Sequence, residues 1–420
     1  MPERVVVVDP YSSGSAFAGA LRKGGFEPVG VLSYPPPPPR YAGSLRTGDY
    51  PRFLTATEDP DSLLGELAAL SPIAVVPGAE SGVLLADRLA ANLTPHRAND
   101  QRRSSARRHK GAMVAALAEQ GIRTIRTLCT STPADAQVWR LEQGLADRDL
   151  VVKPAMSGAT DGVRLVRAGQ DPAAAVAELL DVEVNIFGLP NTDVVVQERI
   201  FGTEYVVDTF SRDGRHTVTN VCRYHKVDNG HNFAVYESIE FLPPDAPENA
   251  ALIPYVESVL DALGIRFGLA HSEVMMTTDG PTLIETGARL AGAGLPGLCE
   301  LATGENGVGR LIDDLAGRAP GRTGYQLVWH VSSVFLIMRE HGTVANAAAY
   351  EKIRALPSCR LLQLNVHDGD LVTPTSDLMS TMHTGWAVLA HRDAAQIRRD
   401  HEALRAIEQE VRLVRTNGPG

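Results

Sequence analysis

The stretch HSEVMMTTDGPTLIETGAR, residues 271–289, decides the fold of this chain. Asp279-Gly280 stands between two apolar runs and predicts a hairpin turn. With the turn centred on Asp279, Glu273 and Glu285 lie six residues to either side and face each other. Opposed carboxylates repel, so one normally has its pKa raised, whereas Mg²⁺ between them removes the conflict and leaves positions for phosphate oxygens. From this stretch alone, two solvated glutamates at strand ends remain an alternative.

A lysine at the end of a short apolar run is the second signal. Leu150-Val151-Val152 predicts a strand that ends at Lys153, and a loop of small residues that includes Ser157 and Gly158 follows it. Backbone N–H groups of such a loop can approach phosphate, while the lysine supplies a point charge. The pattern differs from the GxxxxGK[ST] loop of P-loop NTPases and, taken alone, is more often ordinary surface.

A polar hinge is the third signal. The segment QERIFGTE, residues 197–204, predicts a strand end followed by a glycine turn. Backbone groups exposed at Gln197, Glu198 and Ile200 can read an adenine edge, and Glu204 can accept hydrogen bonds from ribose hydroxyls. Taken alone, the segment is an unremarkable β-turn-β unit.

A β-turn-α-β unit opens the chain. Val5-Val6-Val7-Val8 and Pro28-Val29-Gly30-Val31-Leu32 predict parallel strands buried on both faces. The helix between them begins after a turn-rich segment, where its N-terminus can meet an anion. Because the glycines do not form a GxGxxG pattern, a structural role is favoured over a dinucleotide site.

Composition and charge exclude several classes of protein. Of 420 residues, 40 are basic and 50 are acidic, and the net charge of −10 argues against a nucleic-acid partner. No apolar stretch approaches the roughly 18 residues of a membrane span. The N-terminus does not read as a signal peptide, so we expect a cytoplasmic protein. The sequence has no CxxC pair, so we expect reduced, mostly buried thiols at Cys129, Cys222, Cys299 and Cys359.

In chain order, these signals resemble the ATP-grasp superfamily. The pattern is a helix-opening lysine, a strand lysine before a small-residue loop, a G-x-E hinge, two metal-binding glutamates and a following arginine. The resemblance covers about residues 1–320 and implies an N-terminal Rossmann-like parallel α/β domain over 1–105. It further implies an ATP-grasp fold of two α+β subdomains clasping ATP over 106–322, with the lid subdomain at about 125–198. A C-terminal α+β region over 323–420 follows.

The resemblance also implies that ATP and Mg²⁺ bind and assigns roles to residues. The lysines would hold the α- and β-phosphates, the glutamates would hold Mg²⁺, and the arginine would stabilise the transferred phosphoryl group. The implied ATP-binding residues are Lys110, Lys153, Ser157, Gly158, Gln197, Glu198, Ile200 and Glu204, the implied metal ligands are Glu273 and Glu285, and the implied catalytic residue is Arg289.

Within the superfamily, residues 268–274 and 285–289 are most similar to L-amino-acid ligases and related carboxylate–amine ligases. This implies amide or peptide bond formation from a small-molecule carboxylate and amine through an acylphosphate, with release of ADP and phosphate. Gly287 stands where many members have a metal-site Asn, so the metal shell is one side-chain ligand short. An ATP-grasp carboxylase acting through carboxyphosphate, a non-catalytic nucleotide-binding regulator and an NAD-dependent oxidoreductase stay open as alternatives.

Substrate identity is where the sequence is least informative. His271 shares a strand face with Glu273 and either touches substrate, orients the glutamate or is a core histidine. We expect no nucleic-acid or membrane partner, and a homodimer stays open. A polar cluster either binds a substrate carboxylate or covers a surface loop; it comprises Arg223, His225, Lys226, His231 and Asn232.

Overall fold

The computed structural model describes residues 2–56, 59–158, 160–228, 235–318, 322–376 and 378–414. Of the residues named above, His231 and Asn232 lie outside these ranges.

The N-terminal unit is a parallel sheet in the order β3-β2-β1-β4, covered by helices. Its central strand β1 (Arg4–Val8) pairs in parallel with β2 (Glu27–Leu32) and β4 (Ala74–Pro77), and Val5 to Val8 are fully buried. The predicted Rossmann-like α/β unit is therefore confirmed. The other elements are α1 (Ala16–Lys23), α2 (Pro39–Ala42), β3 (Arg52–Thr55), α3 (Pro60–Ala69) and α4 (Val83–Leu93).

A small antiparallel sheet, in the order β5-β8-β6-β7, forms the lid subdomain. Its apolar side chains, Val152, Val194 and Val196 among them, pack against two helices in a core of their own. The apolar runs at 150–154, 163–166 and 194–198 each predict a strand, and all three strands are present here, the second one from Arg164. The elements are β5 (Thr127–Thr130), α6 (Pro133–Glu142), β6 (Leu150–Pro154), β7 (Arg164–Val166), α7 (Ala173–Leu180) and β8 (Val194–Glu198).

The third unit is an eight-stranded sheet in the order β13-β12-β9-β10-β11-β14-β18-β16. Helix α8 packs on one face in a core that also includes residues of α5, and α9 packs on the other face. The elements up to the C-terminal region are α5 (Lys110–Glu119), β9 (Thr203–Arg212), β10 (Arg215–Val227), β11 (Val235–Phe241), α8 (Asn249–Ala262), β12 (Gly268–Thr277), β13 (Gly280–Gly287), α9 (Leu295–Thr303) and α10 (Gly307–Leu315).

The C-terminal region extends this same sheet. Strand β14 pairs with β11, so the sheet continues across the predicted boundary near 322, which stays a prediction together with the one near 105. The charged segment 392–414 predicts a helix from its sequence, and this prediction was wrong at its end: α12 stops at Glu408, and Leu413 pairs with Val344 in a short strand. The elements are β14 (His330–Phe335), β15 (Gly342–Val344), β16 (Cys359–Leu364), β17 (Leu371–Val372), α11 (Leu378–Thr384), β18 (Gly385–His391), α12 (Ala394–Glu408) and β19 (Leu413–Val414).

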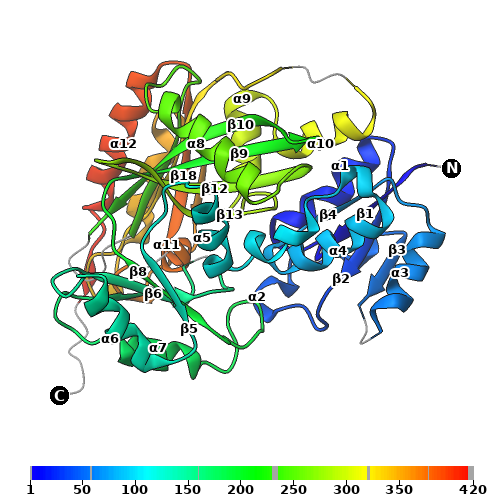
Figure 1. Cartoon of the computed structure of the whole chain (residues 1–420). Coiled ribbons are helices and arrows are strands. Elements are labelled where there is room, and N and C mark those ends of the chain that lie inside the picture. Colours follow the sequence, from blue (N-terminus) through cyan, green and yellow to red (C-terminus); the bar gives the residue numbers. More distant parts are fainter. Residues whose placement is uncertain are drawn as a thin grey trace.

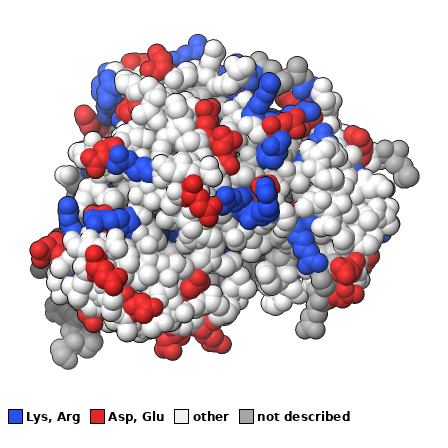
Figure 2. Space-filling view, viewed as in Figure 1, with Lys and Arg blue, Asp and Glu red and all other residues white. Residues whose placement is uncertain are grey.

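The three units surround a common centre. Figure 1 shows the N-terminal unit at the right, the lid subdomain at the lower left and the large sheet above them, with α5 between lid and sheet. Helix α10 packs against α1, so the N-terminal unit and the large sheet share one apolar core. On the face in Figure 2, basic and acidic side chains are interspersed. Among the described residues, no helix is both long and apolar enough to cross a bilayer.

The hinge between lid and sheet predicts a steric requirement at Gly202. A Cβ there would lie 2.0 Å from the carbonyl oxygen of Met276, which belongs to the backbone of β12. Gly202→Ala should therefore lower the free energy of unfolding by about 1–3 kcal/mol. Gly48→Ala is the control, because a Cβ at Gly48 meets no atom within 4 Å. Equal stability of the two variants in urea unfolding would contradict the predicted clash.

Candidate active site

A cavity of about 730 Å³ lies where the lid, the large sheet and the N-terminal unit meet. The structure brings nearly all the predicted site residues together in its walls, although they come from segments up to 179 residues apart (Lys110 to Arg289). The predicted residues that line it are Lys110, Lys153, Ser157, Gly158, Gln197, Glu198, Ile200, Glu204, His225, His271, Glu273, Glu285 and Arg289.

The hairpin of β12 and β13 places the two predicted metal ligands opposite each other. Its register pairs Glu273 with Glu285 as predicted, although the turn lies at Thr278-Asp279 and Gly280 already belongs to β13. The pairing depends on a bulge next to Glu273, because the register nearer the turn pairs Val274 with Leu283 and would otherwise set Glu273 against Ile284. The bulge thus directs both carboxylates to one face of the sheet.

Each of these carboxylates has its own cation. The Nζ of Lys110 lies 3.0 Å from Oε2 of Glu285, and Nε2 of His271 lies 3.4 Å from Oε1 of Glu273. Burial alone would raise the pKa of Glu285, but Lys110 and Lys153 outweigh it and lower that pKa. The expectation of a carboxylate with a raised pKa in this pair therefore fails for Glu285, because the sequence did not show that a lysine would lie beside it.

The two lysines differ in their partners. Lys110 donates a hydrogen bond to the carbonyl of Ser157 at 2.7 Å, in addition to its contact with Glu285. Lys153 is buried, and its ammonium group has no hydrogen-bond or ion-pair partner within the described part of the chain. Burial, and then repulsion from Lys110, lower the pKa of Lys153 to about 8. A buried ammonium group facing a cavity without a partner is suited to an anionic ligand.

The small-residue loop after Lys153 is held by one carboxylate. Asp161 accepts hydrogen bonds from the hydroxyl of Ser157 at 2.6 Å and from the backbone N–H of Ile186 at 3.0 Å. The Ser157 hydroxyl is therefore used within the loop, whereas Gly158 lies on the cavity wall beside Phe187.

The hinge side chains are bonded to protein partners. Gln197 donates to Thr127 at 3.0 Å, and Glu198 accepts from Arg126 at 2.9 Å. These two residues therefore offer mainly backbone groups to the cavity. Ile200 does the same, because its side chain is apolar and cannot form hydrogen bonds.

Glu204, the predicted ribose acceptor, is already bonded to Lys226. Its two oxygens accept hydrogen bonds from the Nζ of Lys226 at 2.8 and 2.7 Å. Burial raises the pKa of Glu204, and Lys226 opposes this rise. A ribose hydroxyl would have to share these oxygens with Lys226, a residue that the sequence placed only in a loose polar cluster.

Arg289 is oriented by a carboxylate that sequence reasoning did not single out. Its Nε donates to Oε2 of Glu80 at 2.7 Å, and Glu80 belongs to the N-terminal unit. Burial lowers the pKa of Arg289, but Glu80 and Glu285 raise it on balance. The signal for Glu80 was its position just after β4, at the carboxyl end of a parallel strand, where α/β domains bind ligands.

The same ion pair accounts for the glycine at the metal strand. A Cβ at Gly287 would lie 2.9 Å from Oε2 of Glu80 and 3.1 Å from Cζ of Arg289. The Glu80–Arg289 pair thus takes up the space that an asparagine side chain would need. Position 287 therefore supplies no side-chain oxygen beside the two predicted metal ligands.

His271 belongs to a buried hydrogen-bond chain. Its Nδ1 lies 2.6 Å from Oδ1 of Asp208, whose other oxygen accepts from Asn220 at 2.9 Å. Burial lowers the pKa of His271, but Asp208 and Glu273 outweigh this effect and raise it to about 9. Of the roles left open for His271, this geometry favours orientation of Glu273.

One predicted substrate residue lies elsewhere. Arg223 forms ion pairs with Glu248 and with Glu240, the latter at 3.5 Å, and it does not line the cavity. His225 lines the cavity and contacts Glu240 at 3.1 Å. The C-terminal region contributes Met382 of α11, which no sequence signal indicated.

Comparison with known proteins identifies the fold around this cavity. Residues 146–297 match the family model of the ATP-grasp domain. The chain therefore contains an ATP-grasp domain in this segment. It is 28% identical to dapdiamide A synthase from Enterobacter agglomerans over 386 residues, and this alignment covers 90% of each chain.

Several solved structures share the fold over nearly the whole chain. The L-amino acid ligase from Bacillus licheniformis has a TM-score of 0.69 at 16% identity, covering 99% of each chain. The N5-carboxyaminoimidazole synthetase from Staphylococcus aureus, complexed with ADP, has a TM-score of 0.64 at 11% identity, covering 97% of this chain and 99% of that one. At these identities the likeness is one of fold, and the predicted ATP-grasp fold class is confirmed.

The environment of Lys153 predicts a pH-dependent change in stability. The folded pKa of about 8 lies below the ordinary value of 10.5, so between these pH values the unfolded chain binds more protons and stability rises with pH. Lys153→Met should therefore stabilise the protein by about 1–3 kcal/mol at pH 7, and the gain should shrink toward pH 10. Urea unfolding at both pH values measures this, with Lys23→Met at an exposed site as the control. Destabilisation by Lys153→Met at pH 7 would contradict a strained ammonium group.

Proposed function

We propose that this protein is an ATP-dependent carboxylate–amine ligase that forms an amide or peptide bond and releases ADP and phosphate. The observation that carries the proposal is the cavity in which the unpartnered ammonium of Lys153 faces the paired carboxylates of Glu273 and Glu285. The likeness to dapdiamide A synthase over 90% of both chains supports the same class of reaction. We expect the substrates to be small molecules, amino acids or natural-product precursors among them, and the enzyme to act in the cytoplasm.

Glu273 and Glu285 would hold Mg²⁺ in this enzyme. Their opposed carboxylate oxygens in one wall of the cavity fit this cation, which prefers oxygen ligands. When bound, Mg²⁺ would neutralise charge at the β- and γ-phosphates. Lys110, which contacts Glu285 in this structure, would then be free to contact phosphate.

The reaction proceeds in two displacements. A carboxylate oxygen of the first substrate attacks the γ-phosphorus of ATP, which breaks the bond to the bridging oxygen and gives an acylphosphate and ADP. The amine nitrogen then attacks the acyl carbon, the carbon–oxygen bond to phosphate breaks, and inorganic phosphate leaves with that oxygen. The amine loses one proton overall. Because the barrier of the first step is mainly one of position and charge, the protein needs no covalent nucleophile.

The protein residues act on charge and position. Lys110 and Lys153 would bind the phosphates, and the loop of Ser157 and Gly158 would cover them. Arg289, with Glu80 fixing its guanidinium, would stabilise the transferred phosphoryl group and the oxyanion at the acyl carbon. The hinge backbone and Glu204 would bind adenine and ribose.

A carboxylase that activates bicarbonate as carboxyphosphate is the second candidate. The fold match to N5-carboxyaminoimidazole synthetase favours it. The two reactions differ in the acid that is phosphorylated, so they are separated by the substrate that releases ADP.

The test is a screen of ADP release against pairs of amino acids and small carboxylates, with mass spectrometry of the products. A condensed amide together with ADP and phosphate is expected. Turnover that requires bicarbonate would favour the carboxylase, and release of pyrophosphate would contradict the proposed mechanism.

Substitutions at the metal strand predict two different defects. Glu285→Gln keeps the shape but removes a metal-bound charge, so ADP release should fall at limiting magnesium and partly recover as magnesium rises. Arg289→Met removes the cation that acts on the phosphoryl group, so turnover should fall by about 10²–10³ without recovery. A magnesium titration of ADP release measures both, with Glu178→Gln on the exposed lid surface as the control. Wild-type turnover of Glu285→Gln at limiting magnesium would rule out this metal site.

A further inference from the structure

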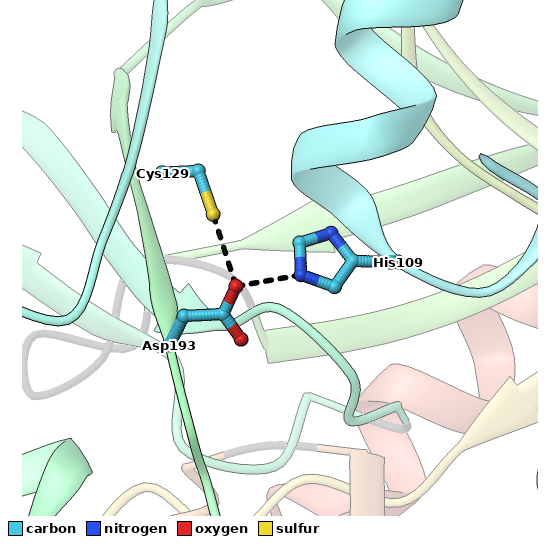
Figure 3. Close-up of side chains that lie close together, drawn as sticks. All are labelled: His109, Cys129 and Asp193. Carbon is cyan, nitrogen blue, oxygen red and sulfur yellow. Dashed lines mark hydrogen bonds and ion pairs between the residues drawn. The ribbon is translucent and has the colours of Figure 1, made fainter. Parts of the chain in front are cut away.

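A second cluster of polar side chains does not line the cavity. It lies next in sequence to Lys110, which does. His109 directly precedes α5, Cys129 lies in β5 and Asp193 directly precedes β8 (Figure 3). One oxygen of Asp193, Oδ2, lies 2.7 Å from Nε2 of His109 and 3.2 Å from Sγ of Cys129. Its other oxygen accepts from the hydroxyl of Thr192 at 3.0 Å.

The hydrogen bonding of His109 decides what this cluster is. The ligand atoms of His109, Cys129 and Asp193 lie within 4.8 Å of one another, a donor set that would suit zinc. However, Nδ1 of His109 accepts the backbone N–H of Ala112 at 3.1 Å, so in the neutral ring Nε2 carries the hydrogen and donates it to Asp193. A metal at Nε2 would require a hydrogen on Nδ1, and that hydrogen would face the N–H of Ala112. The geometry therefore favours a hydrogen-bonded junction.

The thiol of Cys129 is a donor in this junction. Partial desolvation of the sulfur, together with Asp193, raises the pKa of Cys129 to about 12 although the residue as a whole is exposed, so the thiol stays protonated. All four cysteines are free; Cys222 and Cys299 are buried as expected, whereas Cys129 is exposed.

The junction connects the two segments that carry the lysines of the cavity. The side chain of Asp193 binds His109, the residue before Lys110. Its backbone carbonyl accepts the N–H of Ala155 at 3.2 Å, and the carbonyl of Ala155 accepts the N–H of Lys110 at 3.0 Å. In the next two positions of β8, Val194 pairs with Pro154 and Val195 with Lys153.

Lys110 and Lys153 need such a connection. Their ammonium groups are close enough that Lys110 is the main electrostatic cause, after burial, that lowers the pKa of Lys153. Without a bound anion, this repulsion favours separation of α5 from the lid. The hydrogen bond between Asp193 and His109 opposes that separation, because it joins the lid to the start of α5.

We propose that Asp193 is a positioning residue, which joins α5 to the lid so that Lys110 and Lys153 stay directed at the same phosphates. The inference rests on the proposed function only in that both lysines bind the phosphates of ATP. Asp193 does not line the cavity, so its effect on ATP would pass through Lys110.

Two substitutions of Asp193 separate this role from general stability. Asp193→Ala removes both acceptor oxygens and should weaken Mg-ATP binding by about 10-fold or more, because a displaced contact group is costly. Asp193→Asn keeps one oxygen that can accept from both His109 and Cys129, so it should bind Mg-ATP within about 3-fold of wild type. Thr192→Ala, which leaves the Oδ2 bonds intact, is the matched control. Isothermal titration of the full chain with Mg-ATP measures all three.

A double-mutant cycle with Lys110→Met gives the decisive reading. If Asp193 acts through Lys110, Asp193→Ala should weaken binding little further in the Lys110→Met background. If Asp193→Ala does not fold, Cys129→Ala replaces it in the test. Cys129→Ala should weaken Mg-ATP binding by about 3-fold, and this loss should also vanish in the Lys110→Met background. Additive losses would overturn the proposal. So would stoichiometric zinc binding by the wild type that Cys129→Ala abolishes, while failure of the wild type to bind Mg-ATP would instead overturn the proposed function.

Discussion

The contact that the rest of the site depends on is the ion pair of Lys110 with Glu285, 3.0 Å apart. The same ammonium group donates to the carbonyl of Ser157, so one lysine joins the N-terminus of α5, the hairpin of the large sheet and the lid loop. Its charge keeps Glu285 ionised against the effect of burial. A phosphate ligand that drew Lys110 away would leave Glu285 without this partner, and a cation would then have to replace it. In the proposed enzyme, the binding of ATP and of magnesium would therefore be coupled through Lys110.

The N-terminal unit completes the site from the opposite side. Glu80 crosses from the parallel sheet to hold Arg289, and a side chain at Gly287 would press against the ends of both side chains. What looked in the sequence like a missing metal ligand is, in the structure, the room for an oriented arginine. The departure from the common asparagine is thus consistent with a working site, and it weakens the alternative of a degenerate, non-catalytic regulator.

Features that depend on residues close together in the sequence could be predicted, whereas contacts between distant segments could not. The strands and the hairpin follow from local patterns, since a turn fixes the register of the residues next to it. The facing of Glu273 and Glu285 depends in addition on the bulge beside Glu273, which the turn did not predict. The partners of these residues do not follow, because Glu80 and Arg289 are 209 residues apart and only the packing of the units brings them together. Likewise, Arg223 turned to glutamates outside the cavity and α12 ended early, where competing tertiary contacts overrode a plausible local pattern.

In the proposed mechanism the carboxylate substrate is a nucleophile toward the γ-phosphorus of ATP, and the fate of its oxygen tests this most directly. Once the screen has supplied a substrate pair, the carboxylate can be labelled with ¹⁸O and the released inorganic phosphate examined by mass spectrometry. The account predicts that each phosphate carries one oxygen atom from the carboxylate, because the acylphosphate bond to carbon is the one that the amine breaks. Amide formation with unlabelled phosphate, or with the label in AMP, would contradict the acylphosphate mechanism.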